Sequence, residues 1–215
     1  TWTLRVLPYI EQDAFRKRWD HTVGHATGTN LTLLATPISS FKCPSSPAPA
    51  VDSFDFATAS FFGAPAGSVT IYQAGISEYF SMANAPVPGI GTFNGPMDYL
   101  KPPTTLTGIT DGTSNTALIG EVSGGATLYL TTNRVPSGKR PHFGGHWGGN
   151  NRISLRRYST DGLTSGGGNC VINCTNNGSN VYSFHTGGSN VALADGSVRF
   201  LKDSTDPETM AAIVG

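Results

Sequence analysis

Three short apolar segments near the C-terminus constrain the fold more than any other feature of the chain. Residues 181–185, 190–195 and 197–202 have the length and composition of short strands. A pair of glycines separates the first two segments, and Asp195-Gly196 separates the last two. Because Asp-Gly is a strong signal for a tight hairpin, this part of the chain is predicted to form an antiparallel sheet.

The rest of the sequence predicts an α+β fold, with an N-terminal helix packed on a small antiparallel sheet and long ordered loop insertions. Apolar side chains share one stripe of a helix over residues 8–19. A second helix is predicted after Asp206-Pro207, where a capping residue precedes a proline. Further strands are predicted at residues 68–73, 78–82, 117–122 and 127–132. All of these elements fit one globular domain, residues 1–215.

The charge content is low and balanced. Charged residues make up 13% of the chain, about half of the usual ~25%, and 14 basic residues match 14 acidic ones. A neutral chain lacks the basic footprint of a nucleic-acid binder, and no segment approaches the ~18 apolar residues of a membrane span. Nucleic-acid binding and an integral membrane domain are therefore excluded for these residues.

Uncharged hydroxyl and amide side chains take the place of lysine and glutamate, which favours an extracellular or cell-surface location. The first residue is Thr1 rather than Met. We interpret this as a sign of processing or truncation, so that a signal or anchor could precede it.

Cys170 and Cys174 lie in a stretch rich in glycine and asparagine, where a loop could bring their Cα atoms within the ~7 Å that a disulfide needs. We therefore expect a local disulfide. Two free thiols, or half of a zinc site, are the alternatives, although Cys43 alone does not supply the second pair of ligands that zinc requires. Cys43 is then either buried and free, or paired with a residue upstream of Thr1.

Four sequence blocks occur in a recognisable order. They are residues 7–12 (LPYIEQ), 41–45 (FKCPS), 111–116 (DGTSNT) running into 120–121 (GE), and 183–201, in which His185 is followed nine residues later by Asp195-Gly196. In this order they resemble the bacterial prepilin-type family with a processing-associated His, nine residues, Asp-Gly signature, otherwise a domain of unknown function.

The resemblance implies a pilin-like fold and an extracellular subunit similar to a type IV pilin or a type II secretion pseudopilin. Such proteins have a cleaved, methylated leader and a long hydrophobic helix that anchors and polymerises the subunit. That helix is missing from this chain, and residues 7–19 would continue the globular domain downstream of it. The implied partners are copies of itself or other pilin-like subunits.

The signature His185, Asp195 and Gly196 could serve chemistry or architecture. If residues 181–185 pair with 190–195, Asp195 lies about 16–17 Å from the position opposite His185, at ~3.3 Å per residue. A direct His–Asp hydrogen bond is then impossible, and Asp195-Gly196 instead supplies a turn. No nucleophile elbow and no phosphate-binding glycine loop occur in the chain. We therefore predict a non-enzymatic protein.

Calcium is the most credible ion. Asp111, Asn115 and Glu121 carry the oxygen ligands that calcium prefers, although the first two could equally form an ordinary Asx turn. His142 and His146 have the i, i+4 spacing of a zinc pair, but the glycines around them argue against a helix.

The glycine-rich loop 142–152 gives the alternative function, a secreted carbohydrate-binding module. Phe143 and Trp147 could stack on a sugar ring, while Asn150 and Arg152 could form hydrogen bonds with it. The opposing interpretation is that these aromatic side chains fix the loop to the sheet.

Overall fold

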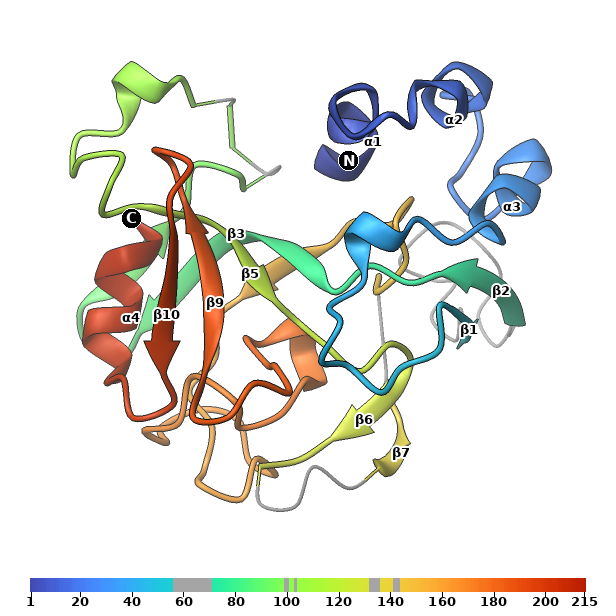
Figure 1. Cartoon of the computed structure of the whole chain (residues 1–215). Coiled ribbons are helices and arrows are strands. Elements are labelled where there is room, and N and C mark those ends of the chain that lie inside the picture. The colour runs from blue at the N-terminus through green and yellow to red at the C-terminus, as the bar shows by residue number, and fades with distance from the viewer. Residues whose placement is uncertain (56–70, 99–100, 103, 132–135, 141–143) are drawn as a thin grey trace.

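A six-stranded, mostly antiparallel sheet forms the centre of one half of the molecule (Figure 1). The computed structural model describes residues 1–55, 71–98, 101–102, 104–131, 136–140 and 144–215. The strand order is β10-β9-β5-β3-β4, and β8 pairs in parallel with β3. The strands are β3 (Tyr79–Val87), β4 (Gly91–Asn94), β5 (Ala117–Glu121), β8 (Arg152–Ser154), β9 (Gly188–Leu193) and β10 (Val198–Lys202).

The hairpin predicted around Asp195-Gly196 is confirmed. Strands β9 and β10 pair in antiparallel register, with Val198 opposite Ala192. Gly196 has a φ of +85°, in the left-handed region that glycine occupies without strain.

The strand predicted at 181–185, and its hairpin with 190–195, are wrong. Tyr182 forms an isolated parallel bridge with Val122, because its N–H donates to the Glu121 carbonyl and its own carbonyl accepts from Ser123 N. The segment therefore continues beside the end of β5, and the glycine pair that follows does not form the predicted turn.

Helix α4 (Pro207–Val214) covers this sheet, and it begins where the sequence predicts. The Asp206 side chain caps it by accepting a hydrogen bond from Thr209 N at 2.8 Å. The helix contacts β3, β4 and β5. Its Met210 and Val214 are buried in a largely aliphatic core with side chains such as Ile153. We call this part, residues 77–131 and 152–215, the sheet region.

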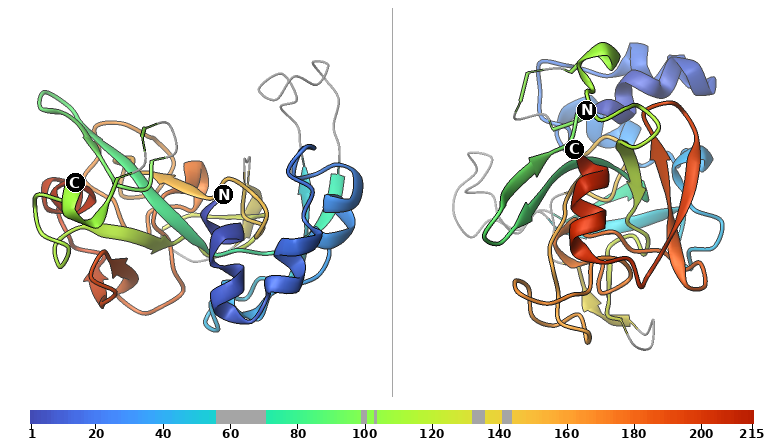
Figure 2. Two further views of the ribbon diagram at one scale, coloured as in Figure 1. Left: turned by 90° about the horizontal axis from the view of Figure 1, so that it is seen from above. Right: turned by 90° about the vertical axis from the view of Figure 1, so that its left-hand side faces the viewer.

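A second region contains the N-terminal helices and a small two-stranded sheet. We call residues 1–55, 71–76 and 144–151 the N-terminal region. Its elements are α1 (Trp2–Val6), a 3₁₀ turn (Leu7–Ile10), α2 (Asp13–Arg18), α3 (Gly28–Leu34), a 3₁₀ turn (Ser39–Phe41), β1 (Val51–Asp55) and β2 (Ile71–Gly75). Figures 1 and 2 place α1–α3 and α4 at opposite sides of the molecule.

The continuous helix predicted over residues 8–19 is wrong. Glu11 has a φ of +60°, and Gln12 N bonds back to the Leu7 carbonyl at 2.8 Å. This left-handed residue ends the 3₁₀ turn, and α2 starts afresh at Asp13. None of the helices within the described ranges has the length and hydropathy of a membrane span.

Of the other predicted strands, 78–82 and 117–122 correspond to β3 and β5, and 127–132 begins as β6 (Thr127–Tyr129). The strand predicted at 68–73 lies partly outside the described residues and overlaps β2. The sequence did not predict α3, β1, β4, β7 (Pro136–Lys139) or β8. The fold is thus mixed α and β, with mostly antiparallel sheets and few helices.

The long loop after β8 is held by a disulfide and by buried amides. Cys170 and Cys174 form the disulfide, with their Cα atoms 5.8 Å apart. Asn176 donates to the carbonyls of Ser123 and Thr127, which fastens the loop to β6.

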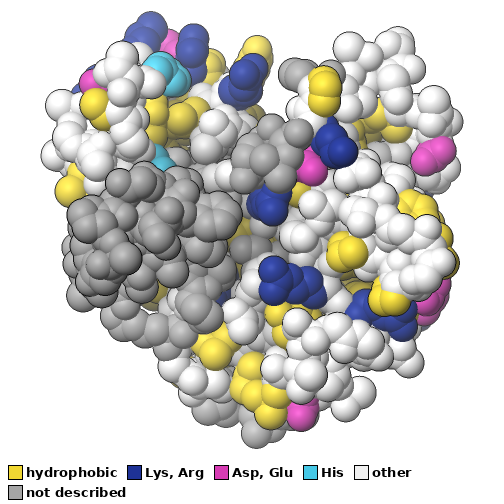
Figure 3. Space-filling model, turned by 180° about the vertical axis from the view of Figure 1, so that it is seen from behind, with side chains coloured by type: hydrophobic (Ala, Val, Ile, Leu, Met, Phe, Trp, Pro, Cys, Tyr) yellow, Lys and Arg dark blue, Asp and Glu magenta, His cyan; other side chains and the backbone are white. Residues whose placement is uncertain are grey.

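On the face that Figure 3 shows, most side chains are uncharged and the charged ones are scattered among them.

Candidate functional site

Cys43, Glu121 and His185 meet where the N-terminal region joins the sheet region. The Cys43 Sγ lies 3.6 Å from His185 Nε2, and the same nitrogen lies 3.2 Å from Glu121 Oε1. The three ligand atoms all lie within 4.8 Å of one another. Each residue comes from a different one of the sequence blocks described above, so segments that are far apart in the chain converge on one point.

Cys43 is positioned by a buried carboxylate. It follows the 3₁₀ turn Ser39–Phe41, and its backbone N–H donates to Glu78 Oε2 at 2.9 Å. The other oxygen of Glu78 accepts hydrogen bonds from the Ser46 hydroxyl and from Gly124 N. Burial raises the pKa of Glu78, although these hydrogen bonds oppose the shift. Glu78 therefore ties the loop of Cys43 to the start of β3.

Glu121 is the last residue of β5, and its side chain is buried. Its Oε2 accepts hydrogen bonds from Ser189 Oγ at 3.0 Å and from Asn190 N at 2.8 Å. These two bonds fix the carboxylate with its Oε1 toward His185.

His185 is held on its other side. Its Nδ1 lies 3.3 Å from Ser45 Oγ, and its backbone N–H donates to Ser183 Oγ at 3.3 Å. With Nδ1 facing Ser45, the opposite nitrogen of the ring points at both Cys43 and Glu121. About 29% of the His185 side chain is exposed, so solvent reaches the site from this side.

A cavity of about 440 Å³ opens beside these side chains. Tyr79, Asn190 and Val198 are among the residues that line it. Burial raises the pKa of the Cys43 thiol and of the Tyr79 phenol. Both groups are therefore held in their neutral forms when no ion is present.

Asp195 and Gly196, the other signature residues, lie in the β9–β10 turn. The Asp195 carboxylate accepts hydrogen bonds from Ser197 Oγ at 2.7 Å and from Ser197 N at 2.9 Å. These bonds hold the pKa of Asp195 below its usual range. Its carboxylate serves the turn, while His185 contacts Glu121. The His and the Asp-Gly of the signature therefore have different structural roles.

The predicted calcium ligands lie at the two ends of one strand. Asn115 Nδ2 donates to the Asp111 carbonyl at 3.1 Å in the turn that precedes β5. Glu121 is at the far end of β5, about 13 Å beyond Ala117 at ~3.3 Å per residue. The structure therefore does not bring Glu121 together with Asp111 and Asn115.

In the described part of the aromatic loop, residues 144–152, the tryptophan belongs to the core rather than to the surface. Trp147 is fully buried, packs against Trp19 and donates to the Thr36 carbonyl at 2.8 Å. It offers no face for a sugar ring. Arg152 lies 3.7 Å from Asp98, and Asn150 is half-buried.

Of the histidine pair considered above, the structure describes His146. His142 and Phe143 lie outside the described residues, as does any pairing of His142 with His146. His146 is buried, and its Nε2 lies 2.9 Å from the Tyr72 hydroxyl. Its contacts within the described chain are those of a core histidine.

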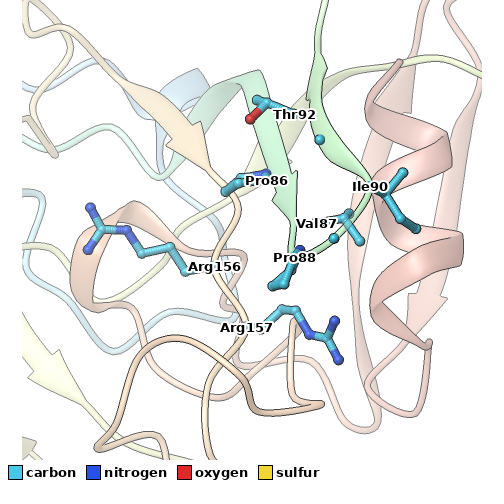
Figure 4. Close-up of a pocket in the computed structure, with 9 residues that line it drawn as sticks. Pro86, Val87, Pro88, Ile90, Thr92, Arg156 and Arg157 are labelled. Atoms are coloured by element: carbon cyan, nitrogen blue, oxygen red, sulfur yellow. The ribbon is translucent and has the colours of Figure 1, made fainter.

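A second hollow, of about 560 Å³, lies at the tip of the β3–β4 hairpin (Figure 4). Pro86, Val87 and Ile90 line it together with Arg156 and Arg157, whose side chains point in opposite directions. Arg157 already donates to the Gly168 carbonyl and lies 3.3 Å from Glu208. Its charge is therefore largely engaged within the protein.

Sequence reasoning did not predict that Cys43, Glu121 and His185 lie together. The available signal was that each residue stands in a block of the same resemblance: Cys43 in residues 41–45, Glu121 in 120–121 and His185 in 183–201. The chain order of the blocks gives no distance between them, so their convergence needed the tertiary structure.

Comparison with known protein families finds a match over most of the chain. The sequence model of a family described as "Protein of unknown function (DUF1559)" matches residues 1–208. No curated protein matches the chain, and no solved structure does either.

Proposed function

We propose a structural function for this chain, which belongs to the DUF1559 family of unknown function. It is a non-enzymatic subunit of the bacterial envelope or cell surface, similar to a type IV pilin or a secretion pseudopilin. The observation that carries the proposal is that the polar residues of the family-like blocks make architectural contacts. Glu121 joins two strands to a loop, and Asp195 closes a turn.

An open strand edge supports assembly. Among the described residues, β10 pairs with β9 alone, so its outer edge carries unpaired backbone groups. Two apolar side chains on this strand are exposed, Val198 by 65% and Phe200 by 49%. An edge of this kind pairs readily with a strand of another subunit. The proposed partners are copies of this chain or other pilin-like subunits.

The ordered loops support an extracellular location. The disulfide Cys170–Cys174 needs an oxidising compartment to persist. Calcium binding by the predicted ligands Asp111, Asn115 and Glu121 stays a prediction, although Glu121 lies at the other end of β5 from the first two.

Assembly can be tested with the complete gene expressed in a bacterium. Immunogold labelling should find the protein in surface or periplasmic assemblies, and cross-linking should give oligomers. Replacing Val198 and Phe200 with lysine should abolish the oligomers. Leu163→Lys is the matched control, because Leu163 is 67% exposed but lies on a loop. A monomer under all conditions, or oligomers unaffected by the β10 changes, would contradict the proposal.

A further inference from the structure

We propose that Cys43, Glu121 and His185 bind a divalent transition metal ion of the zinc class through Sγ, Oε1 and Nε2. The site is independent of the assembly function proposed above. A thiolate, an imidazole and a carboxylate together are typical zinc ligands, whereas calcium and magnesium prefer oxygen alone. The donor set therefore selects the class of metal.

The distances fit a tetrahedral ion. Zinc bonds of about 2.3 Å to sulfur and 2.0–2.1 Å to nitrogen place those two ligands about 3.6 Å apart at a tetrahedral angle. The Cys43 Sγ and His185 Nε2 are 3.6 Å apart. The corresponding nitrogen–oxygen separation is about 3.4 Å for zinc, and the observed distance between His185 Nε2 and Glu121 Oε1 is 3.2 Å. The two separations from His185 Nε2 thus match those of a bound ion, and the Cys43 and Glu121 ligand atoms lie within 4.8 Å of each other.

The surrounding hydrogen bonds orient each ligand atom toward the same point. Ser189 and Asn190 occupy Oε2 of Glu121 and leave Oε1 for the ion. Ser45 faces Nδ1 of His185, which favours the tautomer with a lone pair on Nε2. Glu78 holds the backbone of Cys43. Outer partners of this kind are a regular feature of metal sites.

The same geometry argues against a catalytic thiol. In a cysteine–histidine–carboxylate relay, the thiol and the carboxylate contact opposite nitrogens of the imidazole. Here both groups face Nε2, and Nδ1 faces a serine hydroxyl. The carboxylate cannot orient the ring for proton transfer from the thiol, whereas three donors converging on one point are what an ion requires.

Three protein ligands leave one position of a tetrahedral ion for an outside ligand. The cavity of about 440 Å³ beside the site has room for water or for a small oxygen donor such as a carboxylate. Because Cys43 comes from the N-terminal region and the other two ligands from the sheet region, a bound ion also joins the two regions.

The first experiment uses cobalt(II) as a spectroscopic probe. The purified chain is treated with a chelator and titrated with cobalt(II). A thiolate-to-cobalt charge-transfer band and the intense visible bands of a tetrahedral ion should appear and saturate at one ion per chain. Zinc should displace the cobalt and remove both. Absence of the thiolate band would overturn the proposal, and this result does not depend on any variant folding.

The second experiment measures zinc affinity by competition with a chromophoric chelator. Glu121→Gln and His185→Gln should each weaken binding by about 100-fold or more, since each removes a direct ligand. Asp195→Asn is the matched control, because Asp195 belongs to the same signature but lies in an exposed turn; it should bind zinc like the wild type. If Glu121→Gln and His185→Gln bound zinc as tightly as Asp195→Asn, the assignment of Glu121 and His185 as metal ligands would be contradicted.

Cys43 gives an independent readout. It is the free cysteine of the three in the chain. Saturating zinc should slow its reaction with a thiol reagent by at least tenfold, and chelator should restore the rate. A rate unchanged by zinc would exclude Cys43 as a ligand.

Discussion

The two regions of the molecule bury their apolar side chains in different ways. The N-terminal region has an aromatic core, which includes Trp19, Phe54 and Trp147, under short helices and irregular turns. The sheet region has an aliphatic core, which includes Val191 and Met210, between a sheet and one helix. Large aromatic side chains fill the space between irregular segments, whereas small branched ones fit a regular pleated surface.

The junction between these regions is polar. Glu78, at the start of β3, bonds to Cys43 in the N-terminal region and to Gly124 in the sheet region. Cys43, Glu121 and His185 lie beside it. The comparison shows that the polar residues of the family-like blocks lie at this junction and in the turns, whereas apolar residues of the same blocks, such as Phe41 and Val191, belong to the two cores.

The largest effect is expected from Trp147→Ala. Removing this fully buried side chain should lower the free energy of unfolding by about 3–5 kcal/mol. All three tryptophans of the chain lie in or against the N-terminal core. Their fluorescence therefore reports on this region, while far-UV circular dichroism reports on the whole molecule.

Met210→Ala in the sheet region is the counterpart of Trp147→Ala. It should lower the free energy of unfolding by about 2–5 kcal/mol. The two variants together test whether the cores are separate. Met210→Ala should leave the folded-state tryptophan spectrum unchanged, whereas a shifted spectrum would show that the aromatic core depends on the aliphatic one.

Glu78→Gln changes the junction and should lower the free energy of unfolding by an intermediate amount. The amide nitrogen of glutamine would face a hydrogen-bond donor where an acceptor is needed, so the cost should be about 1–3 kcal/mol. Urea denaturation measures it. The control is Glu208→Gln, which changes an exposed glutamate in α4. Equal stability of Glu78→Gln and the control would mean that Glu78 does not join the regions.

Gly196→Ala should lower the free energy of unfolding by about 1 kcal/mol, because alanine is strained at a φ of +85°. A Cβ there would meet nothing within 4 Å, so the effect is conformational. Gly187→Ala, at a φ of +79° and also in open space, is the matched comparison. Hydrogen exchange should show faster opening of β9 and β10 in Gly196→Ala; unchanged exchange in these strands would argue against the hairpin.

The smallest effect concerns pH. Burial lowers the pKa of His25 from its ordinary value of 6.5. Protonation therefore opposes folding: the cost is absent above pH 6.5 and grows as the pH falls through 6.5 toward the lowered pKa of the folded state. His25→Phe should lose less stability than the wild type between pH 7.5 and 5.5. An equal loss in both proteins would exclude His25 as the source.

The sequence predicted those parts of the fold that depend on local signals. Asp195-Gly196 and Asp206-Pro207 specify a turn and a helix start through their own backbone preferences, and both were located correctly. The helix over residues 8–19 failed because its periodic stripe conceals the left-handed Glu11, which no local rule indicates. The strand at 181–185 failed because Tyr182 bonds to a segment about sixty residues earlier.

The sequence predicted only part of the candidate site. The importance of His185 and Glu121 followed from the resemblance, and the predicted role of Asp195 in a turn away from the histidine agrees with its hydrogen bonds to Ser197. The contact between His185 and Glu121 was not predicted. Long-range contacts of this kind depend on how two loops meet the end of β5, and no periodicity encodes them. Cys43 was recognised as the odd cysteine, either buried and free or paired upstream of Thr1; the structure shows it buried and free at the junction.

The most direct test of the junction is denaturant unfolding followed by tryptophan fluorescence and by far-UV circular dichroism. The two transitions should coincide in the wild-type chain. In Glu78→Gln, the fluorescence transition should move to lower denaturant than the circular dichroism transition, because the N-terminal region loses the carboxylate that binds the Cys43 backbone. Coincident transitions in both proteins, at the same midpoint, would contradict the claim that these polar residues join the two regions.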